Sequence, residues 1–194
     1  MPLTISYSCT DSIISGSWSF PDDSCNFYGK KDILILEIGL AFDMANMASA
    51  SFSIPDDPQG QRKFYNDFIA EADRNGKATP ATMFHIYNRI GRMLATDLST
   101  TDYDFTITCD DTTKGCSEKG FTAHMKDKDK RMNFCNSFFG DGDVGKAIVA
   151  TEKARGVCIG PENALDLRGA QFTRSAILIH ECTHTNHVMD SLGA

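Results

Sequence analysis

The stretch AILIHECTHTNHVMD, residues 176–190, contains the pattern HExxH between His180 and His184. It lies in a segment whose apolar residues recur at helical spacing, from about residue 170 to at least His187. Two histidines four residues apart project from one face of a helix, about one turn apart, and can share one zinc ion. A chain of this composition gives such a string by chance with a frequency of about 0.004. The stretch therefore predicts a helix that carries a zinc site.

Glu181 follows the first of these histidines directly, so we expect its carboxylate to lie beside the ion rather than on it. Zinc lowers the pKa of a bound water, and a neighbouring carboxylate can accept the proton and pass it to a leaving amine. The pattern thus predicts His180 and His184 as zinc ligands and Glu181 as a general base. The alternative is a structural pair of histidines, each satisfied by partners in the protein.

The composition indicates an ordinary folded domain. The chain has 194 residues, of which 41% are hydrophobic and 23% are charged. A net charge of −7 argues against a nucleic-acid partner bound through a basic surface. The longest apolar stretch, residues 33–42, contains Glu37 and is shorter than the roughly 20 residues of a membrane span. We therefore expect neither a nucleic-acid nor a membrane partner, and we expect a monomer.

Seven cysteines are many for a cytosolic protein of this length and favour an oxidising compartment. The first residues show no basic region and no sustained apolar region, so no signal peptide is visible. Two interpretations remain open: a leader that is not present in the given chain, or a leaderless protein with reduced thiols. We favour the first and expect a secreted, extracellular protein. The cysteines are Cys9, Cys25, Cys109, Cys116, Cys135, Cys158 and Cys182.

Local patterns predict the organisation of the chain. Residues 1–29 are expected to be irregular, and residues 30–194 to form one domain. Apolar spacing and breaker residues predict helices over about 31–52, 59–74 and 80–98, the last one capped by Thr79 and Pro80. The first helix is expected to bury one apolar stripe. Its members are Ile33, Leu36, Leu40, Met44 and Met47.

Beyond residue 100 the pattern changes to the alternation typical of strands. Strands are predicted over about 103–109, 121–125 and 132–139, in a small antiparallel sheet, with a loop at 140–143. Together with the helix of the HExxH stretch, these elements predict an α+β domain that is mainly helical.

A resemblance to a known family rests on four strings in the same order. They are FTITCDD with the following Cys116, MNFC at 132–135, GVC at 156–158 and LIHECTH at 178–184. In this order they resemble the fungal deuterolysin family of zinc endopeptidases, the aspzincins, which include lysine-specific metallo-endopeptidases. The resemblance covers about residues 100–187 and implies a secreted, zincin-like metallopeptidase. It also implies the disulfides Cys109–Cys116 and Cys135–Cys158.

If the six other cysteines pair, Cys182 is the odd cysteine, which we interpret as a small buried residue rather than as a thiolate ligand or a redox switch. The alternative for the four paired cysteines is that they are free core residues.

The third zinc ligand is the point at which the chain departs from the family. Aspzincins use an Asp in a GTxDxxYG segment past the second histidine, and no such segment precedes Ala194. Asp190 is the carboxylate that follows the motif, ten residues after His180, as in metzincin-type sites, and we predict it as a ligand. His187 is the second choice, because seven helical residues separate it from His180 by about 10 Å. A water or a ligand on a missing segment remains a further alternative.

These patterns lead to one expected function and two alternatives. The expected function is a secreted zinc endopeptidase that hydrolyses peptide bonds in a protein or peptide substrate, with Zn²⁺ as the cofactor. The strand near 132–139 is expected to present an edge to the substrate backbone. One alternative is a zinc-scavenging antigen, although that related group typically carries Arg at the position of Glu181. The other is an inactive fragment of a longer peptidase.

Overall fold

The computed structural model describes residues 18–26, 29–53, 79–95, 103–155 and 173–190. Within this part the chain is α+β and mostly helical, with a small mixed sheet. The predicted fold class is confirmed at this level. The predicted helix at 59–74 lies outside the described residues.

The sheet has four strands in the order β1-β2-β4-β3. They are β1 (Trp18–Ser19), β2 (Phe105–Thr108), β3 (Ala123–Lys126) and β4 (Arg131–Phe134). The sheet is mixed, since β1–β2 and β2–β4 are parallel and only β3–β4 is antiparallel. The prediction of an antiparallel sheet is therefore wrong. Between β2 and β4 the chain passes through a helix and β3, so β4 returns in the direction of β2.

Two further predictions about this region need correction. Part of the segment expected to be irregular contributes β1 and the short 3-10 helix η1 (Asp23–Cys25). The strand predicted to extend to residue 139 ends at Phe134 and is followed by the 3-10 helix η4 (Asn136–Phe139). The turn between β3 and β4 is the 3-10 helix η3 (Asp127–Asp129), closed by Lys130 at a φ of 47°.

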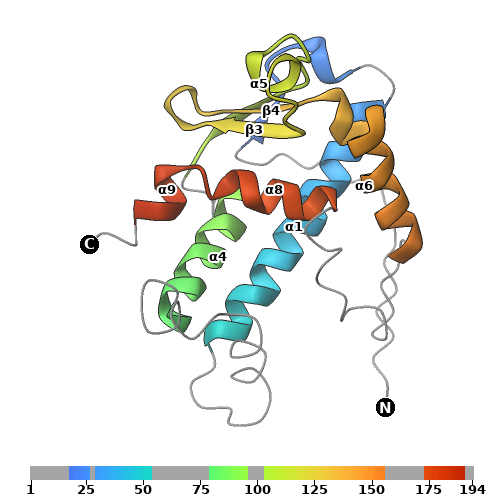
Figure 1. Cartoon of the computed structure of the whole chain (residues 1–194). Coiled ribbons are helices and arrows are strands. Elements are labelled where there is room, and N and C mark those ends of the chain that lie inside the picture. The colour runs from blue at the N-terminus through green and yellow to red at the C-terminus, as the bar shows by residue number, and fades with distance from the viewer. Residues whose placement is uncertain (1–17, 27–28, 54–78, 96–102, 156–172, 191–194) are drawn as a thin grey trace.

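Most of the helices lie on one face of the sheet (Figure 1). The two long helices are α1 (Lys30–Ser53) and α4 (Pro80–Leu94), close to their predicted ranges. As predicted, Thr79 caps α4, with its Oγ1 accepting from the amide of Thr82 at 3.2 Å. The helix α6 (Gly142–Arg155) was not predicted, because only a loop was expected at its start. The remaining helices are α5 (Lys114–Ser117), α8 (Arg174–Cys182) and α9 (Asn186–Met189).

The buried face of α1 is not the predicted stripe. Leu34, Ile38, Ala41 and Ala45 are 0% exposed, and of the predicted stripe only Ile33 is not exposed. The exposed members are Leu36 at 54%, Leu40 at 43%, Met44 at 40% and Met47 at 71%. Because α1 is apolar on more than one face, its periodicity does not select which face is buried. By length and composition, residues Lys30–Ala50 could also cross a membrane, so the expected absence of a membrane partner stays a prediction.

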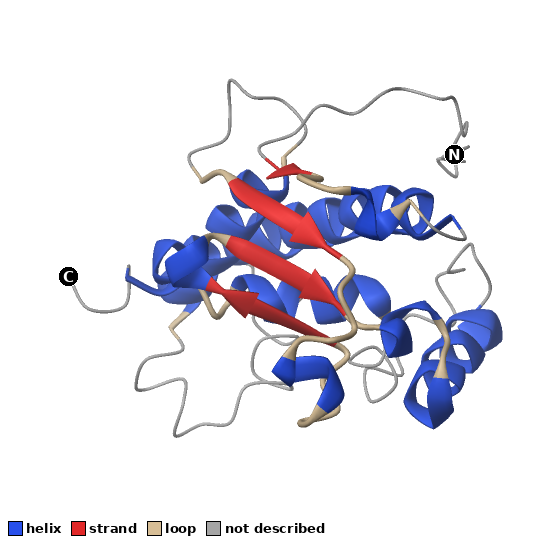
Figure 2. Cartoon of the chain, turned by 90° about the horizontal axis from the view of Figure 1, so that it is seen from above, coloured by secondary structure: helices blue, strands red, loops and turns tan. Residues whose placement is uncertain are grey.

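The molecule is layered, with the hydrophobic core between the sheet and the helices. Figure 1 shows the sheet at the top, α8 and α9 beneath it, and α1 and α4 below them. Figure 2, turned by 90°, shows the strands lying across these helices. The core includes Ile107, Met132 and Phe134 from the sheet and Leu178 from α8, all 0% exposed. The helix α8 is thus held between the sheet and the α1–α4 pair.

The disulfides differ from the pairing that the resemblance implied. The structure joins Cys25 to Cys109 and Cys116 to Cys135. The first bond forms because η1 lies beside the end of β2, where Ser24 Oγ accepts from the amide of Cys109 at 2.9 Å. The predicted bonds Cys109–Cys116 and Cys135–Cys158 are therefore wrong.

The odd cysteine behaves as expected, and two others cannot be placed. Cys182 is a free, fully buried thiol, as predicted. Cys9 and Cys158 lie outside the described residues.

Candidate metal centre

The helix α8 begins at a cap and ends earlier than its sequence pattern predicts. Thr173 caps it by accepting from the amide of Ala176 at 3.3 Å. The predicted helix extends to His187, but α8 ends at Cys182 and α9 starts at Asn186. Thr185 causes the break, since its hydroxyl donates to the Cys182 carbonyl at 2.8 Å and accepts from the Val188 amide at 3.2 Å. His184 consequently lies in the turn between the two helices.

His180 and His184 face one another from this helix end. Both side chains are exposed, and their Nε2 atoms are 3.2 Å apart. The rings are perpendicular, with an interplanar angle of 90° and centroids 4.8 Å apart. Two imidazole nitrogens bound at about 2.1 Å to one tetrahedral zinc are about 3.4 Å apart. The observed pair therefore fits a shared zinc ion with little movement.

Glu181 lies beside this pair but is buried. Its side chain is 6% exposed, and its Oε2 accepts from the Met125 amide of β3 at 2.8 Å. A ligand atom of each of the three side chains lies within 4.8 Å of the other two. Burial raises the pKa of the Glu181 carboxyl from its ordinary value of 4.5 to about 7, although the Met125 hydrogen bond acts in the opposite direction. A carboxyl with a pKa near neutrality is suited to proton transfer in both directions.

The two residues considered as third ligands lie outside this cluster. The His187 ring packs against Tyr103 with centroids 5.0 Å apart, and the Arg89 guanidinium donates to the His187 carbonyl. Asp190 is exposed at the C-cap of α9. Among the described residues, only Glu181 joins the two histidines within ligand distance. The role of Asp190 as a ligand therefore stays a prediction.

The strand beside the metal centre is β3, not the segment near 132–139. In the sheet order, β4 lies between β2 and β3, so it has no free edge, and the prediction that it presents one is wrong. Among the described strands β3 is at an edge of the sheet, and its Met125 amide donates to Glu181 rather than to β4. Polar groups alternate in direction along an antiparallel strand, so Ala123 also faces away from β4. The free edge of β3 thus lies over α8 (Figure 1).

Contacts that the sequence did not reveal hold the start of α9. Tyr103 Oη donates to Asp127 Oδ1 at 2.6 Å, and Asp127 Oδ2 accepts from the Asn186 amide at 3.3 Å. Burial and the Asp127 carboxylate raise the pKa of Tyr103, so its hydroxyl remains a donor. No sequence pattern marks this group, because Asp127 lies 24 positions from Tyr103 and 59 positions from Asn186.

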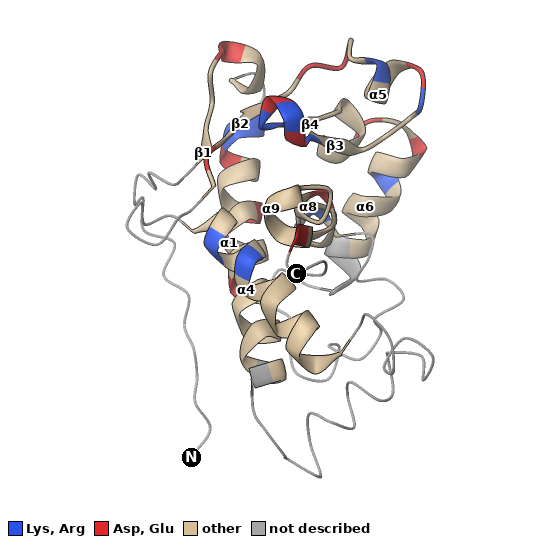
Figure 3. Cartoon of the chain, turned by 90° about the vertical axis from the view of Figure 1, so that its left-hand side faces the viewer, with Lys and Arg blue, Asp and Glu red and all other residues tan. Residues whose placement is uncertain are grey.

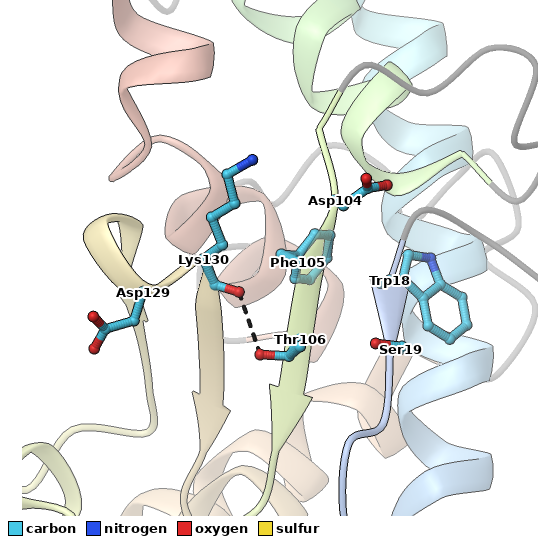
Figure 4. A pocket seen from close by; sticks show the side chains of 7 residues that line it. All are labelled: Trp18, Ser19, Asp104, Phe105, Thr106, Asp129 and Lys130. Atoms are coloured by element: carbon cyan, nitrogen blue, oxygen red, sulfur yellow. Dashed lines mark hydrogen bonds between the residues drawn. The ribbon is translucent and has the colours of Figure 1, made fainter.

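A separate cavity of about 370 Å³ opens over β1 and β2. Figure 4 shows its lining, where Thr106 Oγ1 donates to the Lys130 carbonyl at 3.3 Å. Acidic and basic residues both occur in the turn between β3 and β4 beside it (Figure 3). Neither of the two histidines of the metal centre lines the cavity. Its lining residues are Trp18, Ser19, Asp104, Phe105, Thr106, Asp129 and Lys130.

Comparisons with known proteins give no relative: no family model, no curated protein and no solved structure matches this chain. The functional proposal therefore rests on the geometry of the centre and on the chemistry of its residues.

Proposed function

We propose that the protein is a zinc-dependent endopeptidase with a zincin-like centre at the end of α8. The observation that carries this proposal is the His180–His184 pair, whose Nε2 atoms are 3.2 Å apart, beside the buried Glu181. The two imidazoles provide two ligands at the separation that tetrahedral zinc requires. Glu181 provides a base whose position does not depend on the metal, because β3 holds one of its oxygens.

Each residue then has one task. His180 and His184 would hold the ion, which when bound would acidify a water and polarise the substrate carbonyl. Glu181 accepts the proton of the attacking water and donates it to the nitrogen of the leaving amine. The Met125 amide fixes the orientation of the Glu181 carboxyl during both transfers. The burial that raises the pKa of Glu181 also brings its basicity close to the pH at which it must act.

The position of β3 supports a peptide as substrate. An extended peptide can add to an exposed strand edge through main-chain hydrogen bonds. The edge of β3 lies next to the metal centre. Because Glu181 occupies the Met125 amide, a peptide would pair with the groups of Ala123 and with the Met125 carbonyl, which are also directed away from β4. A peptide bound there passes close to His180 and Glu181. The two disulfides are in keeping with the proposed secretion of the protein.

A second candidate function is zinc binding with little turnover. The lack of a further ligand in the cluster favours this candidate, because among the described residues neither His187 nor Asp190 joins the two histidines and Glu181. Two histidines and a carboxylate that serves as base leave the ion more open than a three-ligand hydrolytic site. A zinc-binding protein, or a fragment of a longer peptidase, would retain the metal without cleaving substrate.

One experiment tests the proposal against this second candidate. The purified chain is loaded with zinc, freed of loosely bound metal and assayed for zinc content and for casein cleavage, with and without a chelator. We expect close to one zinc and a cleavage activity that the chelator removes. Bound zinc without cleavage supports the second candidate, and absence of zinc contradicts both.

Variants locate the metal in the same experiment. His180→Ala and His184→Ala should each lose most of the zinc, because each removes one of two imidazole ligands. His85→Ala is the matched control, since His85 is an exposed histidine on α4. Full zinc retention in either active-site variant would place the metal elsewhere.

A further inference from the structure

A second cluster of metal-ligating side chains lies on the opposite face of the sheet from α8. It consists of Cys116, His124 and Cys135, with one ligand atom of each within 4.8 Å of the other two. His124 on β3 pairs with Asn133 on β4, so both side chains point to the same face. Their neighbours Met132 and Phe134 point into the core. Figure 1 shows α5, which carries Cys116, over this outer face, and α8 beneath the sheet.

The surroundings of the His124 ring are those expected of a metal ligand. Its Nδ1 is buried and has no hydrogen-bond partner among the described residues. A buried polar atom without a partner is rare in folded proteins and calls for an explanation. Gly115 allows the ring to approach, since a Cβ at this position would lie 2.6 Å from Nδ1.

Hydrogen-bond donors are directed at one of the two sulfurs. Asn133 Nδ2 lies 3.3 Å from Cys116 Sγ, and Thr113 Oγ1 lies 3.2 Å from the same atom. The Asn133 amide cannot turn around, because its Oδ1 already accepts from the Thr108 hydroxyl and the Asp110 amide. Donors to sulfur stabilise a thiolate over a thiol. These two residues therefore provide outer-shell support for a metal-bound Cys116.

We propose that Cys116, His124 and Cys135 form a second metal site, for a zinc-like divalent ion, which the Cys116–Cys135 disulfide closes and reduction opens. Two thiolates and one imidazole form a three-ligand set that zinc accepts, with a water in the fourth position. The site is independent of the proposed peptidase function, since it shares no residue with the His180–His184 centre.

The redox step is balanced as follows. A dithiol reductant transfers two electrons and two protons to the disulfide, its own sulfurs join in a new bond, and Cys116 and Cys135 become thiols. Binding of the divalent ion then displaces these two protons. The sulfurs must separate from about 2 Å in the disulfide to about 3.8 Å around a tetrahedral ion, a change that side-chain rotation can supply.

Cobalt provides the test, because thiolate-to-Co²⁺ charge transfer gives an absorption band that histidine ligands alone do not produce. The full chain carrying His180→Ala and His184→Ala, which removes the first centre, is titrated with Co²⁺ before and after reduction with a phosphine. We expect one Co²⁺ with the thiolate band in the reduced protein, and no band in the oxidised protein. Two protons should be released for each ion bound.

Single variants in this background assign the ligands. Cys116→Ala should abolish the band, and His124→Gln should weaken Co²⁺ binding at least tenfold while leaving both thiols. The matched controls are His85→Gln and Cys25→Ala, the latter at a cysteine of the other disulfide, and both should bind as the parent does. Absence of the band after reduction, or equal affinities for His124→Gln and His85→Gln, would overturn the proposal. A reduced chain that unfolds, judged by near-ultraviolet circular dichroism, and is not refolded by Co²⁺ would overturn it as well.

Discussion

At Glu181, burial and one backbone hydrogen bond shift the pKa of the side-chain carboxyl in opposite directions. Burial raises its pKa to about 7, and the hydrogen bond from Met125 offsets only part of this effect. The side chain is 6% exposed, yet it stands next to two exposed histidines. One residue therefore combines a protected position with access to the metal centre, which is the combination that a general base requires.

This environment predicts a pH dependence of stability in the metal-free protein. Below pH 4.5 the Glu181 carboxyl is protonated in both the folded and the unfolded chain. Between pH 4.5 and about 7 the unfolded chain releases this proton while the folded chain keeps it, so the free energy of unfolding falls as pH rises. The expected loss is about 1–3 kcal/mol, and Glu181→Gln should not show it.

Urea unfolding measures this difference. The chelator-treated wild type and Glu181→Gln are compared at several pH values between about 4 and 8, a range that includes both pKa values. Titrating groups distant from Glu181 are present in the two proteins and cancel in the comparison. Parallel pH profiles for the two proteins would show that the Glu181 pKa is not raised.

At the scale of elements, α8 is fixed on α1 by a buried polar contact. Ser175 Oγ donates to Glu37 Oε2 at 2.5 Å, and both side chains are less than 8% exposed. The contact joins the first turn of α8 to the N-terminal half of α1, five residues before His180. It explains how an acidic residue is accommodated on the buried face of an apolar helix.

Ser175→Ala should therefore destabilise the protein by about 1–3 kcal/mol, because a buried carboxylate loses a donor. Thr151→Ala is the matched control: Thr151 is also a helical hydroxyl residue, but its hydrogen bond to the Ala147 carbonyl is exposed. The control should change stability by less than about 0.5 kcal/mol. Equal midpoints of urea unfolding for the two variants would contradict the structural role of this contact.

On the scale of the whole molecule, the two disulfides tie the outer part of the sheet together. The Cys25–Cys109 bond joins residues 84 positions apart and fixes the segment before α1 to β2, and the Cys116–Cys135 bond fixes α5 over the sheet. Neither bond involves α8, where Cys182 remains a buried thiol. The metal helix is therefore held by packing rather than by a covalent link among the described residues.

Mass spectrometry of unreduced peptides should find Cys25 linked to Cys109 and Cys116 linked to Cys135. Alkylation without denaturant should leave Cys182 unmodified, because its thiol is 0% exposed, and alkylation in denaturant should modify it. A peptide that links Cys109 to Cys116 would contradict the fold at the end of β2.

The sequence allows prediction of those features that depend on neighbouring residues. The Thr79 cap, the ranges of α1 and α4 and the approach of His180 to His184 all follow from local spacing and are found in the structure. The direction of β2 relative to β4, the buried face of α1 and the cysteine partners depend on contacts distant in sequence. Spacing alone does not encode these contacts, and those predictions were wrong.

The candidate site also combines features that neighbouring residues encode with features that depend on contacts distant in sequence. Its histidines and Glu181 come from one motif, whereas the Met125 amide that orients Glu181 is a backbone group 56 residues away. Any residue could supply such an amide, so no side-chain pattern reveals it. The early end of α8 likewise depends on the Thr185 hydroxyl, which competes for the Cys182 carbonyl.

The most direct test of the proposed mechanism is the casein-cleaving activity of zinc-loaded Glu181→Gln, measured against the wild type at equal zinc content. The variant keeps both histidines and retains an oxygen for the Met125 hydrogen bond, so we expect its zinc content and fold to be unchanged. It cannot accept the proton of the attacking water, and its activity should fall about 10²–10⁴-fold. Equal cleavage by the two proteins would show that Glu181 is not the base, and zinc-loaded wild type without cleavage would contradict the peptidase function itself.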